Sequence, residues 1–303
     1  MAMIAVSTPE DADVRLDARH FDAHYYANCC GRPYSRDEEW LRFFGTIAER
    51  ITTDIHPSSV LDAGCAIGLL VETLRDRGVD AEGIDLSDYA IAQGHASIGP
   101  YLRVGSIADE FPRRYDLIVS IEVLEHMPPD QAEAAVANFC RHTDDILFSS
   151  SPTDFGEATH VNVRPPEYWA ELFARHGFIR DLDYDAGFIV AWAVRFRRRL
   201  DPVPRIVRDY ERALARTTIE RNELRTQVLR FDRETVALAT ETPALREELA
   251  RVNRQLLETQ AGLAESKDRI FHMERSVFWR LRDLWQSAKA VLRPGTPHDR
   301  QGR

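Results

Sequence analysis

Hydrophobic and polar positions follow two different patterns along this chain, and the change falls between residues 197 and 204. Before it, short apolar runs alternate with amphipathic segments of helical period. This alternation is typical of an α/β domain with a mostly parallel sheet. The runs that we expect to form strands are VLDAGC, AEGIDL, YDLIVSIEV, DDILFSS and GFIVAWAVRF.

The second pattern is a seven-residue repeat. After Pro202 and Pro204 glycine becomes rare, and apolar residues recur at two heptad positions over about ten repeats. The first position holds Val207, Leu214, Arg221, Val228, Thr235, Thr242, Leu249, Leu256, Leu263, Ile270 and Val277, and the second holds Tyr210, Thr217, Leu224, Phe231, Leu238, Leu245, Val252, Thr259, Ser266 and Met273. We therefore predict a coiled coil that self-associates or docks on a partner. A helix folded back on the first domain is the alternative, although it would favour a wider apolar stripe. Pro243 predicts a kink or a restart of the helix.

These patterns divide the chain into four segments, which are an N-terminal helical lid at 1–56, the α/β domain at 57–200, the coiled coil at 201–277, and an amphipathic basic helix with a disordered tail at 278–303. The last segment mixes Phe278, Trp279 and Trp285 with arginine and lysine. Such a helix can lie in a membrane interface or dock into a groove of a partner protein. The sequence leaves both open.

The charge of the chain and its cysteines indicate which partners and which cellular compartment to expect. The formal net charge of -10 argues against nucleic acid as a partner. The four cysteines show no paired framework, and we find neither a signal peptide nor 18 consecutive apolar residues. We therefore expect a cytoplasmic protein, with peripheral contact at the inner membrane surface left open by the last helix.

A glycine-rich turn is the first candidate site. Val60–Leu61 ends an apolar run, DAGCAIG follows at residues 62–68, and a helix-like segment comes next. Glycines at such a turn let a ligand approach the backbone closely at the sheet edge. The dinucleotide fingerprint would need glycine at Ala66 and Leu69, and the turn lacks the G-K-[ST] ending of phosphate loops. A nucleoside-type cofactor other than NAD or FAD fits best.

The next apolar run ends in a carboxylate, Asp85, about twenty residues after the turn. In that position it can accept hydrogen bonds from both hydroxyls of a ribose. Aspartate after a strand is also a frequent helix cap or turn former, and Leu86–Ser87 would suit that role too. The ribose interpretation therefore depends on the combination with the turn.

The run that starts at Tyr115 ends in Glu122, Glu125 and His126. Together, D-x-G-C-A-x-G, G-I-D-L-S and Y-D-L-I-V-S-I-E-V-L-E-H-M resemble the class I S-adenosylmethionine (SAM) dependent methyltransferases, in particular the group that methylates small metabolites and sugars. The resemblance extends from Tyr25 to Arg198. It implies a Rossmann-like, seven-stranded, mostly parallel sheet with helices on both faces, a methyltransferase domain at 57–200, and SAM as the cofactor.

The resemblance also implies roles for individual residues. Asp62 would lie under the methionine amine, the turn with Gly64, Cys65 and Gly68 would contact the methionine and ribose portions, and Asp85 would bind the ribose hydroxyls. Further cofactor contacts are expected at Tyr26, Leu86, Ser106, Ile107 and Glu122. Family members usually carry aspartate in the loop after the third sheet strand to hold the adenine amine, whereas this chain has Ser106 there, with Asp109 nearby. Tyr26 could equally pack in the core.

Two histidines are candidates for the catalytic base that a hydroxyl acceptor needs. We prefer His160, in the long polar loop after the fifth strand, over His126, which could instead be structural or close over the cofactor. A loop histidine bonded to the backbone is the alternative for His160, and Asp154 or Glu157 could orient the base. The spacing of His, Cys and Asp predicts no metal site, and the sequence leaves assistance by magnesium open.

The sequence thus predicts a SAM-dependent O-methyltransferase acting on a sugar hydroxyl of a surface glycan or glycolipid, because coiled coils with such tails resemble bacterial proteins of surface-polysaccharide assembly. Another small molecule, such as a quinone or polyketide, is the alternative acceptor. A non-catalytic coiled-coil interaction protein with a SAM-binding domain is the alternative of a different class. The presence of Asp62, Gly64, Gly68 and Asp85 argues against that last alternative.

Overall fold

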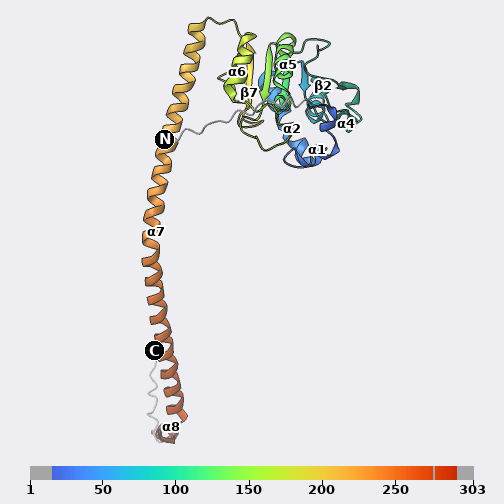
Figure 1. Ribbon diagram of the computed structural model, residues 1–303. Coiled ribbons are helices and arrows are strands. Elements are labelled where there is room, and N and C mark those ends of the chain that lie inside the picture. Colours follow the sequence, from blue (N-terminus) through green and yellow to red (C-terminus); the bar gives the residue numbers. More distant parts are fainter. Residues whose placement is uncertain (1–15, 276, 292–303) are drawn as a thin grey trace, which may run out of the picture. The chain divides into compact units, whose positions relative to one another are not determined.

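The computed structural model describes residues 16–275 and 277–291 of the chain. It divides into two compact units, with the boundary between Leu214 and Ala215 (Figure 1). Residues 1–15 of the predicted lid and 292–303 of the predicted tail lie outside the described residues.

The first unit contains a seven-stranded sheet. Its strands are β1 Ser59–Ala63, β2 Asp80–Asp85, β3 Leu102–Val104, β4 Leu117–Ile121, β5 Asp145–Ser149, β6 Phe178–Arg180 and β7 Val194–Arg198, and they lie in the order β3-β2-β1-β4-β5-β7-β6. Strands β1 to β5 pair in parallel, whereas β7 runs antiparallel to both β5 and β6. The predicted Rossmann-like, mostly parallel sheet of seven strands is therefore confirmed. The strand order reverses beside β1, and open α/β sheets bind ligands at the carboxyl ends of the strands at such a point.

Alternate residues of the central strands pack into two separate cores. Leu117 and Val119 of β4 belong to one core with the helices α2 Glu38–Arg50 and α3 Leu69–Arg75, while Ile118 between them belongs to the other, with α5 Pro129–His142 and α6 Pro166–Arg175. All three side chains are fully buried. Central strands buried on both faces read as continuous apolar runs, which is why the sequence revealed them. Two further short helices are α4 Asp88–Ala92 and the 3-10 turn Gly99–Tyr101.

Short helices precede β1. They are the 3-10 turn Ala18–His20, α1 Ala23–Asn28, α2 and the π-helical turn Ile51–Ile55. Asp22 and Asp37 cap α1 and α2 by accepting backbone N–H bonds. Arg36 ties this segment to α3 through a fork of hydrogen bonds to the Glu72 carboxylate, 2.6–3.1 Å long. The N-terminal segment is thus held against the sheet domain.

One of the predicted strands is a strand only in its second part. In the run GFIVAWAVRF, β7 begins at Val194, whereas the residues before it form a loop. The loop packs Ile189 into the same core as α2 and α3, leaving that side chain 6% exposed. Its apolar residues are therefore required by packing rather than by the sheet.

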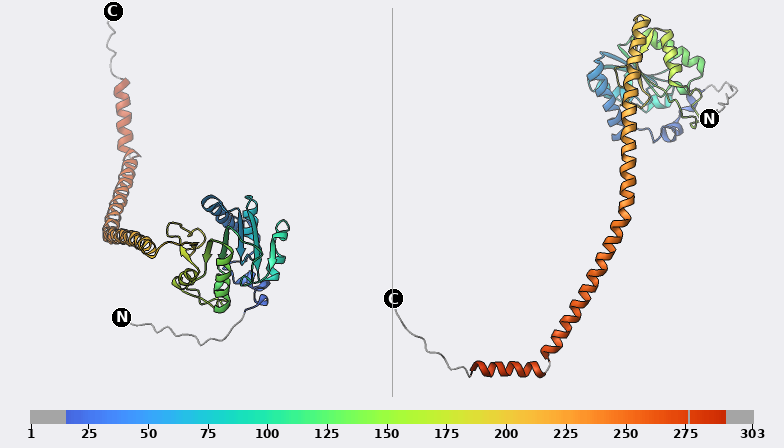
Figure 2. Two further views of the ribbon diagram at one scale, coloured as in Figure 1. Left: turned by 90° about the horizontal axis from the view of Figure 1, so that it is seen from above. Right: turned by 90° about the vertical axis from the view of Figure 1, so that its left-hand side faces the viewer.

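The described part of the second unit is helical, and its first helix begins in the first unit. α7 extends over 73 residues, Val203–Arg275, and α8 over Val277–Val291 (Figure 2). The helix is continuous through Pro243, which excludes a restart; the kink that was the other expected outcome stays a prediction. The Thr242 hydroxyl donates to the Leu238 carbonyl in the preceding turn. Among the described residues, no helix combines the length and apolar character that crossing a membrane requires.

Candidate active site

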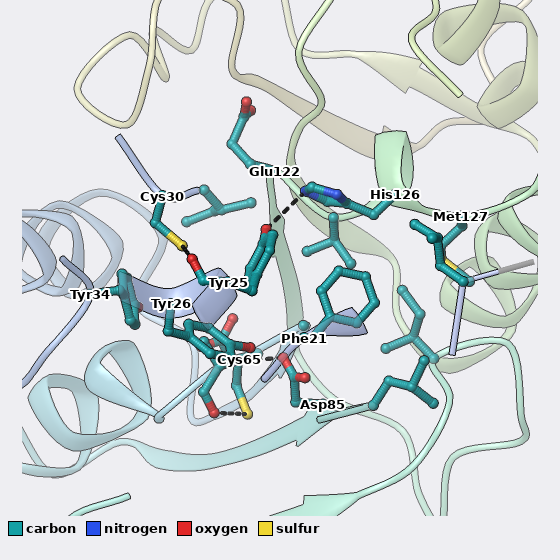
Figure 3. Close-up of a pocket in the computed structure, with 18 of the residues that line it drawn as sticks. Phe21, Tyr25, Tyr26, Cys30, Tyr34, Cys65, Asp85, Glu122, His126 and Met127 are labelled. Carbon is teal, nitrogen blue, oxygen red and sulfur yellow. Dashed lines mark hydrogen bonds between the residues drawn. The ribbon is translucent and has the colours of Figure 1, made fainter. Parts of the chain in front are cut away.

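A pocket of about 860 Å³ lies at the carboxyl ends of β1, β2, β3 and β4. This is within the usual size range of small-molecule sites. Its walls come from the glycine-rich turn, the loops after β2, β3 and β4, the post-β5 loop and the N-terminal helices. In Figure 3, Asp85 and Cys65 lie at one end of the cavity and Glu122 and His126 at the other, with Phe21, Tyr25 and Tyr26 between them.

The glycine-rich turn has a backbone that only glycine accommodates at two places. Gly64 has φ +93°, and a Cβ there would lie 2.3 Å from Cγ2 of Val123. Gly68 has φ +79°, and its Cβ would lie 2.8 Å from Cδ1 of Ile98. The N–H groups of Gly64 and Cys65 both donate to the Ile84 carbonyl, at 2.8 and 3.1 Å. The turn is therefore clamped to the end of β2.

Asp85 holds the same turn from the other side. Its Oδ2 accepts the Ala66 N–H at 2.8 Å, and its Oδ1 accepts the Ser87 N–H at 2.8 Å. Ala66 itself has φ +48°. Each carboxylate oxygen keeps a further lone pair toward the pocket. Asp85 thus has the turn-forming role that the sequence left open, and it retains the acceptors that the predicted ribose contact needs.

Asp62, in β1, is 5% exposed and lines the pocket. Burial, and secondarily the charge of Asp85, raise the pKa of this carboxyl to about 8. A buried carboxylate of this kind favours a cation beside it, because the cation offsets the lost hydration. The Asp62 carboxylate can therefore accept hydrogen bonds from the amine of SAM and offset its positive charge.

The Asp62 shift predicts that SAM affinity depends on pH. Between pH 5.5 and 7.5 the empty protein holds a proton on Asp62, and binding of the ammonium group must release it. Affinity should therefore rise with pH, by up to about tenfold per pH unit. The folding stability of the protein without ligand depends on pH in the opposite direction. The pKa of Asp62 in the folded protein lies above its unfolded value of 3.8. Asp62 therefore contributes stability that is fully present below pH 3.8 and is lost as the pH rises through about 8.

Calorimetric titrations in two buffers of different ionisation enthalpy measure the proton release directly. Asp62→Asn is the matched control, because it keeps the shape and cannot titrate. Equal proton release by the two proteins would contradict the assignment of Asp62.

The remaining predicted cofactor contacts lie around the turn. Leu86, Ser106, Ile107 and Asp109 line the pocket, as does Cys65. The Ser106 Oγ accepts the Ala108 N–H at 3.1 Å, and its own hydroxyl hydrogen can still be donated. The adenine role of Ser106 or Asp109 stays a prediction.

Tyr26 fits both roles that the sequence left open, which are packing in the core and contact with the cofactor. It is 7% exposed and packs in the core with its ring stacked on Tyr89 at 6.0 Å, yet it also lines the pocket. Burial and the nearby Asp85 raise the pKa of its phenol well above the usual range. Its neighbour Tyr25 points the other way, and its hydroxyl lies 3.3 Å from Nε2 of His126 (Figure 3).

The structure brings the two candidate histidines together. Their ring centroids are 4.6 Å apart, and both line the pocket. The nitrogens of His126 are engaged by the Tyr25 hydroxyl and by Thr159 Oγ1, the latter at 2.8 Å from Nδ1. Burial, and secondarily His160, lower the pKa of His126 to about 4, so its ring is neutral at pH 7.

His160 has a different set of partners. Its Nδ1 lies 2.7 Å from the Asp154 carbonyl, which can only accept, so Nδ1 carries the proton. Nε2 consequently has a free lone pair, and Glu157 Oε2 lies 3.9 Å from it. Of the two histidines, only His160 therefore presents an unengaged basic nitrogen.

Glu125 lies behind the histidines and is fully buried. Its Oε1 accepts the Ser151 N–H at 3.0 Å, whereas Oε2 has no hydrogen-bond partner. Burial, and secondarily Glu122, raise the pKa of Glu125 to about 8. Ligand atoms of Glu125, His126 and His160 lie within 4.8 Å of one another, so this cluster could hold a cation, a possibility that sequence spacing did not reveal.

Sequence reasoning missed several contacts at this end of the pocket. Glu122, a predicted cofactor residue, has φ +52° and accepts the Trp192 indole N–H at 2.9 Å through Oε1. Trp192 was hidden within the run interpreted as a strand. Nothing in the sequence around Tyr25 indicates its contact with His126, which is 101 positions away.

Comparison with known proteins agrees with this geometry. Residues 34–179 match the family model of a methyltransferase domain. The ubiquinone biosynthesis O-methyltransferase of Idiomarina loihiensis is 30% identical over 111 residues, which cover 34% of this chain and 46% of that protein. The enzyme of the same description from Saccharophagus degradans is 38% identical over 101 residues, covering 30% and 42%. The chain thus spans about half the length of the curated relatives it matches.

Among solved structures, magnesium protoporphyrin IX methyltransferase from Synechocystis PCC 6803 with bound SAM matches with a TM-score of 0.48 and 15% identity, covering 63% of this chain and all of that one. The matched family segment, residues 34–179, contains the glycine-rich turn, Asp85 and both histidines. Residues 34–179 of the chain therefore correspond to a methyltransferase domain.

Proposed function

We propose that the protein is an O-methyltransferase that transfers the methyl group of SAM to a hydroxyl of a small molecule. When bound, SAM supplies an electrophilic methyl group. The observation that carries the proposal is the unengaged Nε2 of His160 in the same pocket as Asp62 and Asp85. A hydroxyl must lose its proton during methylation, and a neutral imidazole within reach can accept it.

The surrounding residues support this role of His160. The Asp154 carbonyl fixes the tautomer, and Glu157 at 3.9 Å can stabilise the imidazolium that forms. The side chain of His160 is 10% exposed, which limits competition by water. His126, bonded through both nitrogens, would position rather than exchange protons.

Two acceptor classes stay in consideration. A sugar hydroxyl of a surface glycan or glycolipid is the class that the sequence predicts. An aromatic hydroxyl, as in a quinone precursor, has support from the pocket wall, which includes Phe21, Tyr25, Trp40 and Phe43. The names of the curated relatives favour the same class.

Methyl transfer from labelled SAM tests the proposal. The full-length protein is incubated with catechol-type and sugar hydroxyl acceptors, and with matched amines in place of the hydroxyls. We expect product with one hydroxyl class and none with the amines. Transfer to amines alone would contradict O-methylation. A parallel reaction with EDTA tests the Glu125, His126 and His160 cluster, since loss of activity that Mg²⁺ restores would indicate a bound cation rather than His160 as the base.

Contact of the protein with a membrane through α8 also stays a prediction. α8 carries exposed Leu281, Leu284 and Trp285, with the Lys289 ammonium 3.8 Å from the Trp285 ring centroid. These features support peripheral contact with a membrane. Sedimentation of the protein with vesicles of anionic and of neutral lipid would measure it.

A further inference from the structure

The heptad residues of α7 are exposed along the second unit. From Leu224 to Met273, the large apolar residues at the two heptad positions are between 47% and 67% exposed, namely Leu224, Val228, Phe231, Leu238, Leu245, Leu249, Val252, Leu256, Leu263, Ile270 and Met273. We call this line of residues the seam. At 1.5 Å per residue the 73-residue helix is about 110 Å long. An apolar line of this length on one helix is far larger than the patches that monomeric proteins leave in water.

The period of the seam indicates what covers it. A repeat of 3.5 residues keeps facing a partner only if that partner is another helix with the same repeat, wound around it. Leu229, Val236, Leu257 and Phe271 form a second exposed apolar line, one position after the first seam position. It is separated from the seam by residues that are polar or small, namely Asp232, Ala239, Gln260 and Glu274. The surface therefore fits a helix rather than a globular domain or a lipid layer.

We infer that α7 pairs with α7 of a second copy of this chain, as a parallel, in-register, two-stranded coiled coil. The charges beside the seam carry this choice. In such a dimer, the residue before each first seam position lies next to the partner residue five positions later in number. Where both of these are charged in α7, the signs are opposite in all three cases, which are Glu220 with the partner's Arg225, Glu241 with the partner's Arg246, and Arg269 with the partner's Glu274.

Other arrangements of two copies lose this complementarity. A shift by one heptad would place Glu220 beside the partner's Asp232 and Arg269 beside the partner's Lys267, while Glu234 and Glu248 would lie beside the partner's Arg246, so that like and opposite charges are mixed. An antiparallel pair with full overlap would place Glu234 beside the partner's Glu248 and Glu241 beside its own copy, and on the other flank Asp232 beside the partner's Arg246 and Glu211 beside the partner's Lys267, so that like and opposite charges are again mixed. Of these three arrangements, only the parallel in-register pair brings opposite charges together at these positions without any like-charge pair, and this favours it, while the seam supplies the driving force.

The polar seam residue Arg221 fits the same arrangement. In a parallel two-stranded coiled coil the aliphatic part of the Arg221 side chain can pack on the seam while its guanidinium reaches outward to the partner's Glu220. A polar residue at a seam position favours one register at some cost in stability. This inference concerns the partner of the chain and does not depend on the proposed methyl acceptor.

Mass and cross-linking test the arrangement in the full-length protein. Light scattering should give twice the chain mass of 34.7 kDa at micromolar concentration. Leu256→Cys should form an intermolecular disulfide under mild oxidation, because the same seam residue meets its own copy only in a parallel, in-register pair. Ala261→Cys, on the outward face, is the matched control, and the unmodified protein gives the background from its native cysteines. A monomer, a trimer, or a dimer in which the Leu256→Cys variant cross-links no better than the Ala261→Cys variant would overturn the inference.

A charge-swap series provides a second, independent readout. Glu241→Arg alone and Arg246→Glu alone should each weaken the dimer by about tenfold, because two symmetry-related pairs become repulsive. The double variant restores opposite signs and should recover the original dissociation constant. Sedimentation at low salt measures this, and a double variant as weak as the single ones would overturn the predicted pairing.

Discussion

Replacing His160 with alanine should lower the rate of methyl transfer by about 10²–10⁴-fold while leaving the dissociation constant of SAM unchanged. The rate effect is the usual range for loss of a general base. Binding should persist because the groups expected to hold the cofactor, Asp62, Asp85 and the glycine-rich turn, belong to other elements. Single-turnover kinetics and calorimetry separate the two quantities.

The control for this prediction is His95→Ala. His95 is exposed, bonds to Ser97 at 2.8 Å and does not line the pocket, so its loss should change neither quantity. Partial rescue of the His160 variant by added imidazole would support a proton-transfer role over a structural one. Full activity of His160→Ala across the pH range would remove it as the base.

Replacing Gly64 with alanine should destabilise the domain by about 2–5 kcal/mol and weaken SAM binding. A left-handed backbone costs alanine roughly 1–2 kcal/mol. Overpacking of a tight site adds about 1–3 kcal/mol, and the new Cβ would lie 2.3 and 2.8 Å from the two methyl carbons of Val123. Urea unfolding monitored by circular dichroism measures the change.

Gly78→Ala separates these two causes. Gly78 has φ +81°, similar to Gly64, but a Cβ there would meet nothing within 4 Å. It should therefore cost only the conformational part, roughly 1–2 kcal/mol. Adding Val123→Ala to Gly64→Ala should recover part of the stability by removing the clash. The close-packing explanation fails if the Gly64 and Gly78 variants are equally mild.

The sequence predicted those parts of the fold in which buried side chains produce a recognisable pattern of apolar residues. Strands such as β4 and β5 are covered on both faces, so they appear as continuous apolar runs, and the residues after them lie together at one sheet edge. The pattern therefore predicts Asp62, Asp85, His126 and His160 at one edge of the sheet, and all four line the pocket. Their chemical roles stay predictions.

Contacts that depend on tertiary packing could not be predicted in this way. The approach of Tyr25 to His126, and of Trp192 to Glu122, joins segments 101 and 70 positions apart without any local signal. The unpartnered oxygen of Glu125 likewise becomes evident only when its surroundings are known. At Pro243 the local rule for proline predicted a kink or a restart, and the flanking helix formers and the exposed face allow α7 to continue without a restart.

The measurement that tests the central claim most directly is calorimetric titration of the full-length protein with SAM, with NADH and the Asp85→Ala variant as controls. SAM should bind, NADH should not, and Asp85→Ala should weaken SAM binding by about 1–3 kcal/mol because ribose hydroxyls lose their acceptor. Circular dichroism verifies that the variant is folded. Absence of SAM binding, or equal affinity of the Asp85 variant, would contradict the account of this pocket.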